Sequence, residues 1–409
     1  MKRTSVSLRR ATHALVNTTS DPNVGCACRS ALPKLMTRMS QRGIVSATSW
    51  TLSKAGMGMG NVKDQMLPTS LLSEEDPPLY RHMTPPHTVA IIGAPLTFGQ
   101  PFAGVDNSPI MLREAGLRTD LTRLGWRVQD SPDLELQTPK ALLRGQTHVE
   151  STFPGKLTKG VHAKNALLVG RGTEIIFQKV ASVCREGQFP LTLGGDHSIS
   201  LGSLAGVLKE RPNTGVIWVD AHADINTPYN SLSGNMHGMP LGMLIKGIDI
   251  NYSSIPGCQW LAEIGAPLLD PSSLVYVGLR DVDVAERDAI RELGICCFTM
   301  YDIDRYGIGR VMEMAMEHLL AIDPNRPLHL SFDIDAVDPE HAPATGTAVR
   351  GGLTYREAHY VCENVAASGC LASADIVELN PTLSDGVGAE DTVQLGLHLI
   401  TSFMGKSIL

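Results

Sequence analysis

The sequence predicts an α/β fold in which helices flank a mainly parallel β-sheet. From residue 88 onward, short apolar runs rich in strand-forming residues alternate with stretches of helical periodicity, which is the pattern of repeated strand–helix units. Several of the apolar runs end directly in Asp, Glu or His, at the place where parallel sheets bind their ligands. At 409 residues with 43% hydrophobic side chains, the chain has enough apolar material for one large domain.

Seven short apolar segments are the predicted strands, because each is rich in residues that favour strands and has the length of one. They are residues 88–95, 189–195, 215–222, 274–280, 295–300, 327–335 and 371–380. The segments between them are expected to carry the helices.

Four helices are predicted from apolar residues at helical spacing. The first is expected near residues 107–117, where Asn107 or Ser108 can cap the helix and Pro109 suits its first turn. The others are residues 173–187, 309–322 and 354–369. The first and last of these three end in Gly, a common helix terminator. No internal repeat interrupts residues 88–409, so this region is predicted to form a single domain.

The first 73 residues differ in composition from the rest of the chain. They hold ten Lys and Arg but only two acids, Asp21 and Asp64, and are rich in Ser and Thr, which is typical of an organelle transit peptide. An untargeted tail is the alternative. We therefore expect a transit peptide or leader at 1–73, a linker at 74–87 and the folded domain at 88–409. A mitochondrial matrix location is preferred over a plastid or the cytoplasm.

The bulk numbers argue against several classes of protein. The formal net charge of −7 argues against a nucleic-acid-binding surface. No apolar run reaches the roughly 18 residues that a membrane-spanning helix needs. The eight cysteines include no CxxC pair, so they are expected to stay reduced, without a zinc knuckle.

Acidic and histidine side chains gather after four of the predicted strands. In chain order they are Asp196, His197, Asp220, His222, Asp224, Asp333, Asp335 and Glu378. Side chains two apart on a strand project to the same face, so Asp220, His222 and Asp224 are expected to converge, as are Asp333 and Asp335. A single Asp after a strand is most often a helix cap or turn former. The recurrence of acidic and histidine residues at several strand ends favours one shared site.

The predicted site has the composition of a metal centre. Four carboxylates and two imidazoles, counting His197, cannot stay ionised together in one crevice unless cations compensate them. Six such ligands suit two divalent cations that share bridging carboxylates. The oxygen-rich set favours Mn²⁺ over metals that prefer thiolates. The sequence therefore predicts two Mn²⁺ ions per chain.

Five motifs, in this order, resemble those of the ureohydrolases and, among them, the arginases. They are GGDHS (194–198), DAHADIN (220–226), SGNMHG (233–238), SFDIDAVDP (331–339) and VELNP (377–381). The resemblance spans residues 88–405 and so covers essentially the whole predicted domain. It implies a three-layer α/β/α sandwich around an eight-stranded parallel sheet, assembled as a homotrimer.

The resemblance also implies two ligand sets and a reaction. One manganese ion would be held by His197, Asp220, Asp224 and Asp333. The other would be held by Asp220, His222, Asp333 and Asp335, so that Asp220 and Asp333 bridge. The implied enzyme hydrolyses L-arginine to L-ornithine and urea. A guanidinium of pKa roughly 13.8 resists attack by neutral water, whereas two cations that flank one water supply a bridging hydroxide near neutral pH.

Three further positions match family residues near the reacting group. His237 matches a histidine outside the metal shell that is thought to deliver a proton to the leaving nitrogen, and a structural histidine is the alternative. Glu378 matches a carboxylate that pairs with the guanidinium through a planar, two-point contact. Thr347 matches a residue that lines the same pocket.

The amino-acid end of the substrate has its own matching positions. Asn226, Ser233 and Asn235 match residues that bind the substrate carboxylate. Asp283 and Glu286 match residues near the α-amino group, although an Asp at a helix start is also an ordinary cap.

The sequence departs from the arginase pattern at three positions. Val284 and Ala348 stand where arginases usually have Pro, and Met239 replaces the usual Gln. None of these removes a ligand. The closest alternative is an agmatinase or another guanidino-compound ureohydrolase, but agmatinases typically carry Glu where Val349 stands. A one-zinc deacetylase of the same superfamily and a non-catalytic metal-binding protein are the remaining alternatives.

Overall fold

The computed structural model describes residues 88–143 and 160–407. The predicted leader at 1–73 and linker at 74–87 lie outside the described residues, so the position of the domain boundary stays a prediction. Cys26 and Cys28 lie there too. The six cysteines within the described residues form no disulfide with one another.

Eight parallel strands form one sheet, which confirms the predicted fold class. The strands are β1 (Thr88–Ala94), β2 (Arg127–Asp130), β3 (Phe189–Gly194), β4 (Gly215–Val219), β5 (Leu274–Leu279), β6 (Cys296–Thr299), β7 (Leu328–Asp333) and β8 (Leu371–Val377). Their order across the sheet is β2-β1-β3-β8-β7-β4-β5-β6. The seven predicted segments all contain a strand, and β2 is the one that the apolar pattern missed. It is a short edge strand that pairs with β1 alone and is partly exposed.

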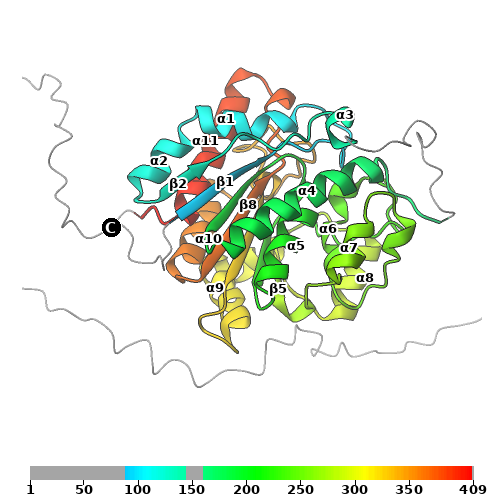
Figure 1. Ribbon diagram of the computed structural model, residues 1–409. Helices are drawn as coiled ribbons and strands as arrows, with labels where there is room; N and C mark the ends of the chain where they lie inside the picture. The colour runs from blue at the N-terminus through cyan, green and yellow to red at the C-terminus, as the bar shows by residue number, and fades with distance from the viewer. Residues whose placement is uncertain (1–87, 144–159, 408–409) are drawn as a thin grey trace, which may run out of the picture. The chain divides into compact units, whose positions relative to one another are not determined.

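Helices cover both faces of the sheet (Figure 1). Those that pack against one face are α3 (Pro139–Leu142), α4 (Ala166–Arg185), α5 (Ser200–Glu210), α6 (Pro240–Leu244), α7 (Gln259–Ile264) and α8 (Val284–Leu293). Those that pack against the other are α1 (Ser108–Glu114), α2 (Leu117–Arg123), α9 (Met300–Leu320), α10 (Tyr355–Ala367) and α11 (Gly386–Phe403). The described residues thus form three layers.

Alternation along the strands builds the two apolar cores between these layers. In β1, Val89 and Ile91 belong to the core beneath α1 and α11, whereas Ala90 and Ile92 belong to the core beneath α4 and α5. The alternation follows from the two-residue period of a strand. Both sides are apolar because both sides are covered, as in other parallel sheets.

The predicted helices exist, but their bounds differ. The segment 107–117 is divided into α1 and α2 at Gly116, which has φ of +109°. Helix α4 begins at Ala166, seven residues before the predicted start. Helix α9 begins at Met300, and its backbone is non-helical at Gly307, where φ is +77°. The predicted terminators Gly187 and Gly369 both have positive φ, which confirms their role.

The strand order determines where the functional residues can meet. Strands β3, β8, β7 and β4 are consecutive in the sheet, and these are the four strands that the predicted acidic and histidine residues follow. Because all strands are parallel, their carboxyl ends lie at one edge of the sheet. Residues from four distant parts of the sequence are therefore brought to one place.

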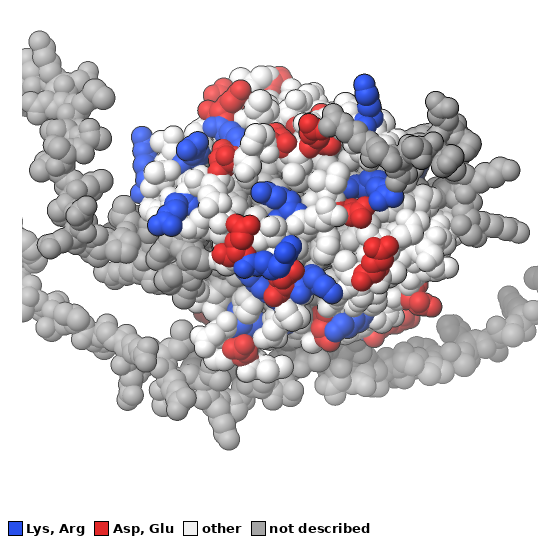
Figure 2. Space-filling view, in the orientation of Figure 1, with Lys and Arg blue, Asp and Glu red and all other residues white. Residues whose placement is uncertain are grey.

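Two surface features complete the description. Figure 2 shows Lys and Arg interspersed with Asp and Glu on the face in view, so the charge of this face is mixed. Within the residues that the structure describes, no helix combines the length and apolar character needed to cross a bilayer.

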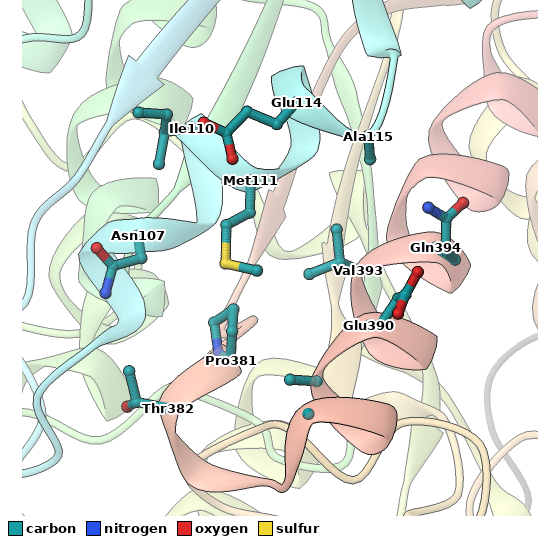
Figure 3. A pocket seen from close by; sticks show the side chains of 12 residues that line it. Asn107, Ile110, Met111, Glu114, Ala115, Pro381, Thr382, Glu390, Val393 and Gln394 are labelled. Carbon is teal, nitrogen blue, oxygen red and sulfur yellow. The ribbon is translucent and has the colours of Figure 1, made fainter.

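A groove of about 600 Å³ lies between α1 and the first half of α11 (Figure 3). Met111, Pro381 and Val393 give it an apolar lining, and Glu114 and Glu390 also line it. None of its lining residues is a predicted site residue, so the groove is separate from the site described below.

Candidate metal centre and active site

The predicted ligands converge, but not by alternation along a strand. Strand β4 ends at Val219, so Asp220, His222 and Asp224 all lie in the loop that follows, and the reasoning from a two-residue strand period was wrong. The loop backbone turns them together, with Asp224 at φ +49°. Likewise Asp333 is the last residue of β7, while the next predicted ligand belongs to a short 3₁₀ helix.

The first cluster surrounds one nitrogen of His197. Its Nδ1 lies 3.1 Å from Asp220 Oδ2, 3.0 Å from Asp224 Oδ2 and 3.0 Å from Asp333 Oδ2. The imidazole is fully buried, yet Nδ1 makes no hydrogen bond of acceptable geometry. A buried nitrogen without a hydrogen bond that faces three carboxylate oxygens fits a cation held among all four groups.

The second cluster shares a carboxylate with the first. His222 Nδ1 lies 3.4 Å from Asp220 Oδ1 and 3.1 Å from Asp335 Oδ2. Asp220 therefore directs one oxygen to each histidine, and ligand atoms of His197, Asp220 and Asp333, and again of Asp220, His222 and Asp335, lie within 4.8 Å of one another. This is the arrangement of a bridging ligand. The second bridging role, assigned to Asp333, stays a prediction.

Trp218, which was not among the predicted site residues, contacts His197 of the first cluster and Asp220, the carboxylate that the two clusters share. Its ring stacks on that of His197 with centroids 4.1 Å apart and planes 6° apart. Its Nε1 donates a 3.0 Å hydrogen bond to Asp220 Oδ2. A Trp in the middle of an apolar strand carries no distinct signal of this role, because the same residue would be expected in any buried strand.

The electrostatics of the clusters favour cations. Burial, followed by the charges of Asp335 and Asp220, raises the pKa of Asp333 well above its ordinary value. Burial also raises the pKa of Asp224 to about 6. Burial acts against the charged form of His197, but the carboxylates around it outweigh this and raise its pKa well above the ordinary value. The carboxylates therefore need positive charge beside them, supplied by protons or by metal ions.

This competition predicts that binding of divalent metal ions strengthens as pH rises. Because the pKa values of His197 and His222 are raised, both imidazoles hold a proton at neutral pH, and each cation must displace one. Below the raised pKa values, affinity for each ion should thus increase by about tenfold or more per pH unit. Competition with a chelator between about pH 6 and pH 8 measures this. The variant His341→Ala should keep the same slope, and an affinity independent of pH would contradict the assignment of these histidines.

His237 and Glu378 form a pair beside the clusters. His237 Nδ1 donates to Glu378 Oε1 over 3.0 Å, which leaves its Nε2 free to act on another group. Burial acts against the charged imidazole, but the hydrogen bond to Glu378 outweighs it and raises the pKa of His237 to about 9. His237 is therefore protonated at neutral pH.

Glu378 is more constrained than the sequence suggested. Its Oε1 accepts from the backbone N–H of His197 at 2.8 Å as well as from His237, and its backbone has φ of +62°, a strained conformation for a residue with a side chain. Only Oε2 remains for a guanidinium. The predicted two-point contact with a guanidinium stays a prediction.

Two residues act here in ways that the sequence reading missed. Asp196 is buried and accepts a 2.8 Å hydrogen bond from the N–H of Gly99, whose carbonyl accepts from the N–H of His237. Thr347 donates from Oγ1 to Asp335 Oδ2 over 2.8 Å. Asp196 thus holds the loop that supports His237, and Thr347 holds a predicted metal ligand, while its place in the substrate pocket stays a prediction.

Asn226 and Asp283 connect the two predicted halves of the amino-acid subsite. Asn226 Nδ2 donates to Asp283 Oδ2 over 2.9 Å. The Oδ1 of Asn226 is buried and makes no hydrogen bond. A second N–H of the amide can still donate to a carboxylate, and the unpaired Oδ1 can accept from an ammonium. Asn226 is therefore equipped for either end of an α-amino acid.

The other residues predicted for the amino-acid subsite differ in exposure and in their hydrogen-bond partners. Ser233 is exposed, and its Oγ accepts from the N–H of Asn235 at 3.2 Å. Asn235 Oδ1 accepts from Lys164 Nζ at 3.2 Å, which places a cation near the predicted carboxylate site. Glu286 is buried, and both its oxygens already accept backbone N–H groups, those of Ile225 and Asp283. Glu286 therefore supports the backbone around the predicted subsite, and each of its oxygens already accepts a hydrogen bond.

None of the three departures from the arginase pattern is a residue of the two clusters. Val284 is an exposed residue at the first position of α8, and Ala348 is exposed. Met239 is fully buried in the core beneath α5 and α6. A thioether suits an apolar core, so this substitution of Gln is explained by its surroundings.

Comparisons with known proteins agree with the geometry. The family model described as the arginase family matches residues 87–405. The chain is 41% identical over 337 residues to an arginase of Glaciozyma antarctica, covering 79% of this chain and 89% of that one. It is 43% identical over 296 residues to arginase-1 of Homo sapiens, covering 72% and 86%. The crystal structure of Entamoeba histolytica arginase in complex with L-ornithine has a TM-score of 0.65 at 32% identity, covering 80% of this chain and 100% of that one.

Proposed function

Because the chain belongs to the arginase family of hydrolases, we propose that it hydrolyses L-arginine to L-ornithine and urea at a binuclear manganese centre. The observation that carries the proposal is the shared carboxylate of Asp220, which faces His197 with one oxygen and His222 with the other. Two ligand sets joined by one residue suit two cations that act together.

The residues of each set fit divalent metal ions. His197, Asp220, Asp224 and Asp333 would hold one ion, and Asp220, His222 and Asp335 the other, with Asp333 as the proposed second bridge. When bound, the ions would lower the pKa of a water between them and so provide the nucleophile. The oxygen-rich sets favour Mn²⁺, and no cysteine is among the described ligand residues.

His237 is proposed to supply the proton that the leaving amine requires. The carboxylate of Glu378 can only accept, so the hydrogen bond between them fixes a proton on His237 Nδ1. With a pKa of about 9, the ring also carries a proton on Nε2 at neutral pH. That second proton is the one available to the leaving nitrogen. Glu378 would both orient His237 and contact the guanidinium through Oε2.

The variant His237→Asn is therefore expected to lower kcat by about 10²- to 10⁴-fold, the usual contribution of a general acid, while two manganese ions per chain remain bound. Steady-state urea release and metal analysis by mass spectrometry provide the two measurements. His398→Asn, a change at a partly buried histidine that is hydrogen-bonded to Tyr355, serves as the control and should alter neither. Loss of manganese in His237→Asn would show that the residue belongs to the metal centre instead.

The overall proposal is tested by purifying the protein with Mn²⁺ and measuring urea and ornithine in equal amounts from L-arginine. Two manganese ions per chain would support the binuclear site, whereas one zinc would favour the deacetylase alternative. Failure to release urea from any guanidino compound would overturn the proposal.

Two finer points are also proposed. A homotrimer is the assembly that the family resemblance implies. A mitochondrial matrix location is supported by the excess of Lys and Arg over acids in residues 1–73.

A further inference from the structure

A series of buried, hydrogen-bonded side chains extends from the metal centre into the sheet. His197 Nε2 lies 2.9 Å from Ser331 Oγ, and Ser331 Oγ donates to Asp375 Oδ1 over 2.6 Å. Ser331 and Asp375 face each other on neighbouring strands β7 and β8. Both side chains are fully buried.

Asp375 accepts hydrogen bonds from two directions. Its Oδ2 accepts from Ser203 Oγ at 2.6 Å and from Ser200 Oγ at 3.3 Å, both on α5, while Oδ1 is directed to Ser331. Burial acts against its charge, but His329, whose Nε2 lies 3.3 Å from Oδ2, the charge of His197 and the hydrogen bond from Ser203 outweigh burial and lower the pKa of Asp375 from its ordinary value. Asp375 is therefore an ionised group that only accepts.

The number of protons then determines which group donates in each hydrogen bond between His197, Ser331 and Asp375. A serine hydroxyl has one hydrogen, and that of Ser331 goes to Asp375. Toward His197, Ser331 can therefore only accept. His197 must therefore keep a proton on Nε2, and the proton that a cation displaces is the one on Nδ1, which faces Asp220, Asp224 and Asp333.

We infer that Asp375, acting through Ser331, is a positioning residue that holds His197 in the tautomer required for metal binding. The inference rests on the proposed function, because it takes His197 as a metal ligand. Without the hydrogen bonds through Ser331, the three carboxylates that face Nδ1 would attract the proton of a neutral imidazole to that nitrogen. A proton on Nδ1 would exclude a cation. Such outer partners of a ligating histidine typically fix its tautomer and ring orientation.

Asp375→Asn tests the inference with almost no change in volume. The amide can direct its oxygen to Ser200 and Ser203 and its N–H₂ to Ser331. Ser331 would then donate to His197 and favour the wrong tautomer. Manganese affinity at the His197 site should fall by about 10- to 100-fold, while the His222 site keeps its ion. Titration against a chelator, with metal content by mass spectrometry, should show one tight and one weak ion in place of two tight ions.

Ser331→Ala removes the connection and should cause a loss of similar size. In the double variant, Asp375→Asn should add no further loss, because the two residues act along one path. Ser182→Ala, which removes a serine hydroxyl that donates to Glu186 outside this network, is the control and should leave both affinities unchanged. A purely structural role would instead lower the melting temperature in all variants without a selective effect on one ion.

The outcomes separate this inference from the proposed function. If the unmodified protein binds two manganese ions and releases urea, but Asp375→Asn binds both ions with unchanged affinity, the positioning role is wrong and the function stands. Equal and additive losses in Ser331→Ala and Asp375→Asn would also overturn it. If Asp375→Asn does not fold, Ser331→Ala alone tests the inference. Wild-type manganese affinity in Ser331→Ala would then show that Asp375 does not act on His197 through Ser331. If the unmodified protein binds no manganese, the proposed function itself fails.

Discussion

Asp220→Asn is expected to remove most of the manganese and to lower urea production by about 10³-fold or more. Asp220 directs Oδ2 toward His197 and Oδ1 toward His222, so the loss of its charge weakens both ion sites at once. A catalytic metal supplies several kcal/mol of stabilisation, and a loss of about 4 kcal/mol corresponds to about 10³-fold in rate.

The environment of Asp220 adds to this effect. Its two oxygens accept from Trp218 Nε1 at 3.0 Å and from the N–H of His222 at 2.7 Å. An Asn must present its own N–H₂ to one of these donors, which leaves a buried donor unpaired at a cost of about 1–3 kcal/mol. Metal analysis, urea release and thermal unfolding measure the three consequences.

A matched control distinguishes the bridging role from the general loss of a carboxylate. Asp270 caps a short 3₁₀ helix and accepts from the N–H and Oγ of Ser272, outside either cluster. Asp270→Asn should retain two manganese ions and full activity. If Asp220→Asn also kept both ions and its turnover, the shared-ligand assignment would be wrong.

L-arginine is expected to be preferred over agmatine by about 10⁴-fold in kcat/KM, since a site built to bind a group that the substrate lacks leaves its own polar groups unpaired. The structure supplies such groups in the loop after β4. Asn226 has a second amide N–H beside the one that it donates to Asp283, and the ammonium of Lys164 contacts Asn235, so both can donate to a carboxylate. Agmatine has no carboxylate to meet them.

Ser233→Ala should narrow this preference by about 10- to 100-fold, the value of one hydrogen bond to a charged group of about 1.5–3 kcal/mol. Ser233 is exposed, so the fold should tolerate the change. Its neighbour Leu232 is 85% exposed, and Leu232→Ala is the control that alters the loop without removing a polar group. Urea release from L-arginine, agmatine and 4-guanidinobutyrate at one Mn²⁺ concentration gives the ratio. A higher kcat/KM for agmatine would reassign the substrate and leave the family unchanged.

The seven strands predicted from apolar runs were found because buried parallel strands are apolar on both faces. Strand β2, with the sequence RVQD, is polar and lies at the edge, so the same pattern missed it. The early start of α4 was missed for a different reason. Its first turns contain Gly170 and Gly172, which weaken a helix in isolation. They are required because a Cβ at Gly170 would lie 2.4 Å from the backbone of Gly257 and one at Gly172 would lie 2.6 Å from Leu96.

The sequence by itself determined the chemistry of the site. Asp, His and Glu follow apolar runs that can only be buried strands, and their types and motif order are enough to predict metal ligands and the family. Only the tertiary structure decided how these groups are connected. Contacts such as that between the N–H of His197 and Glu378, 181 residues apart, depend on strand order and loop conformation. Asp220 faces two histidines with its two oxygens, and a series of hydrogen bonds connects His197 to Asp375. Neither could be predicted, because hydrogen bonds depend on distances and angles between atoms, which residue spacing in the sequence does not contain.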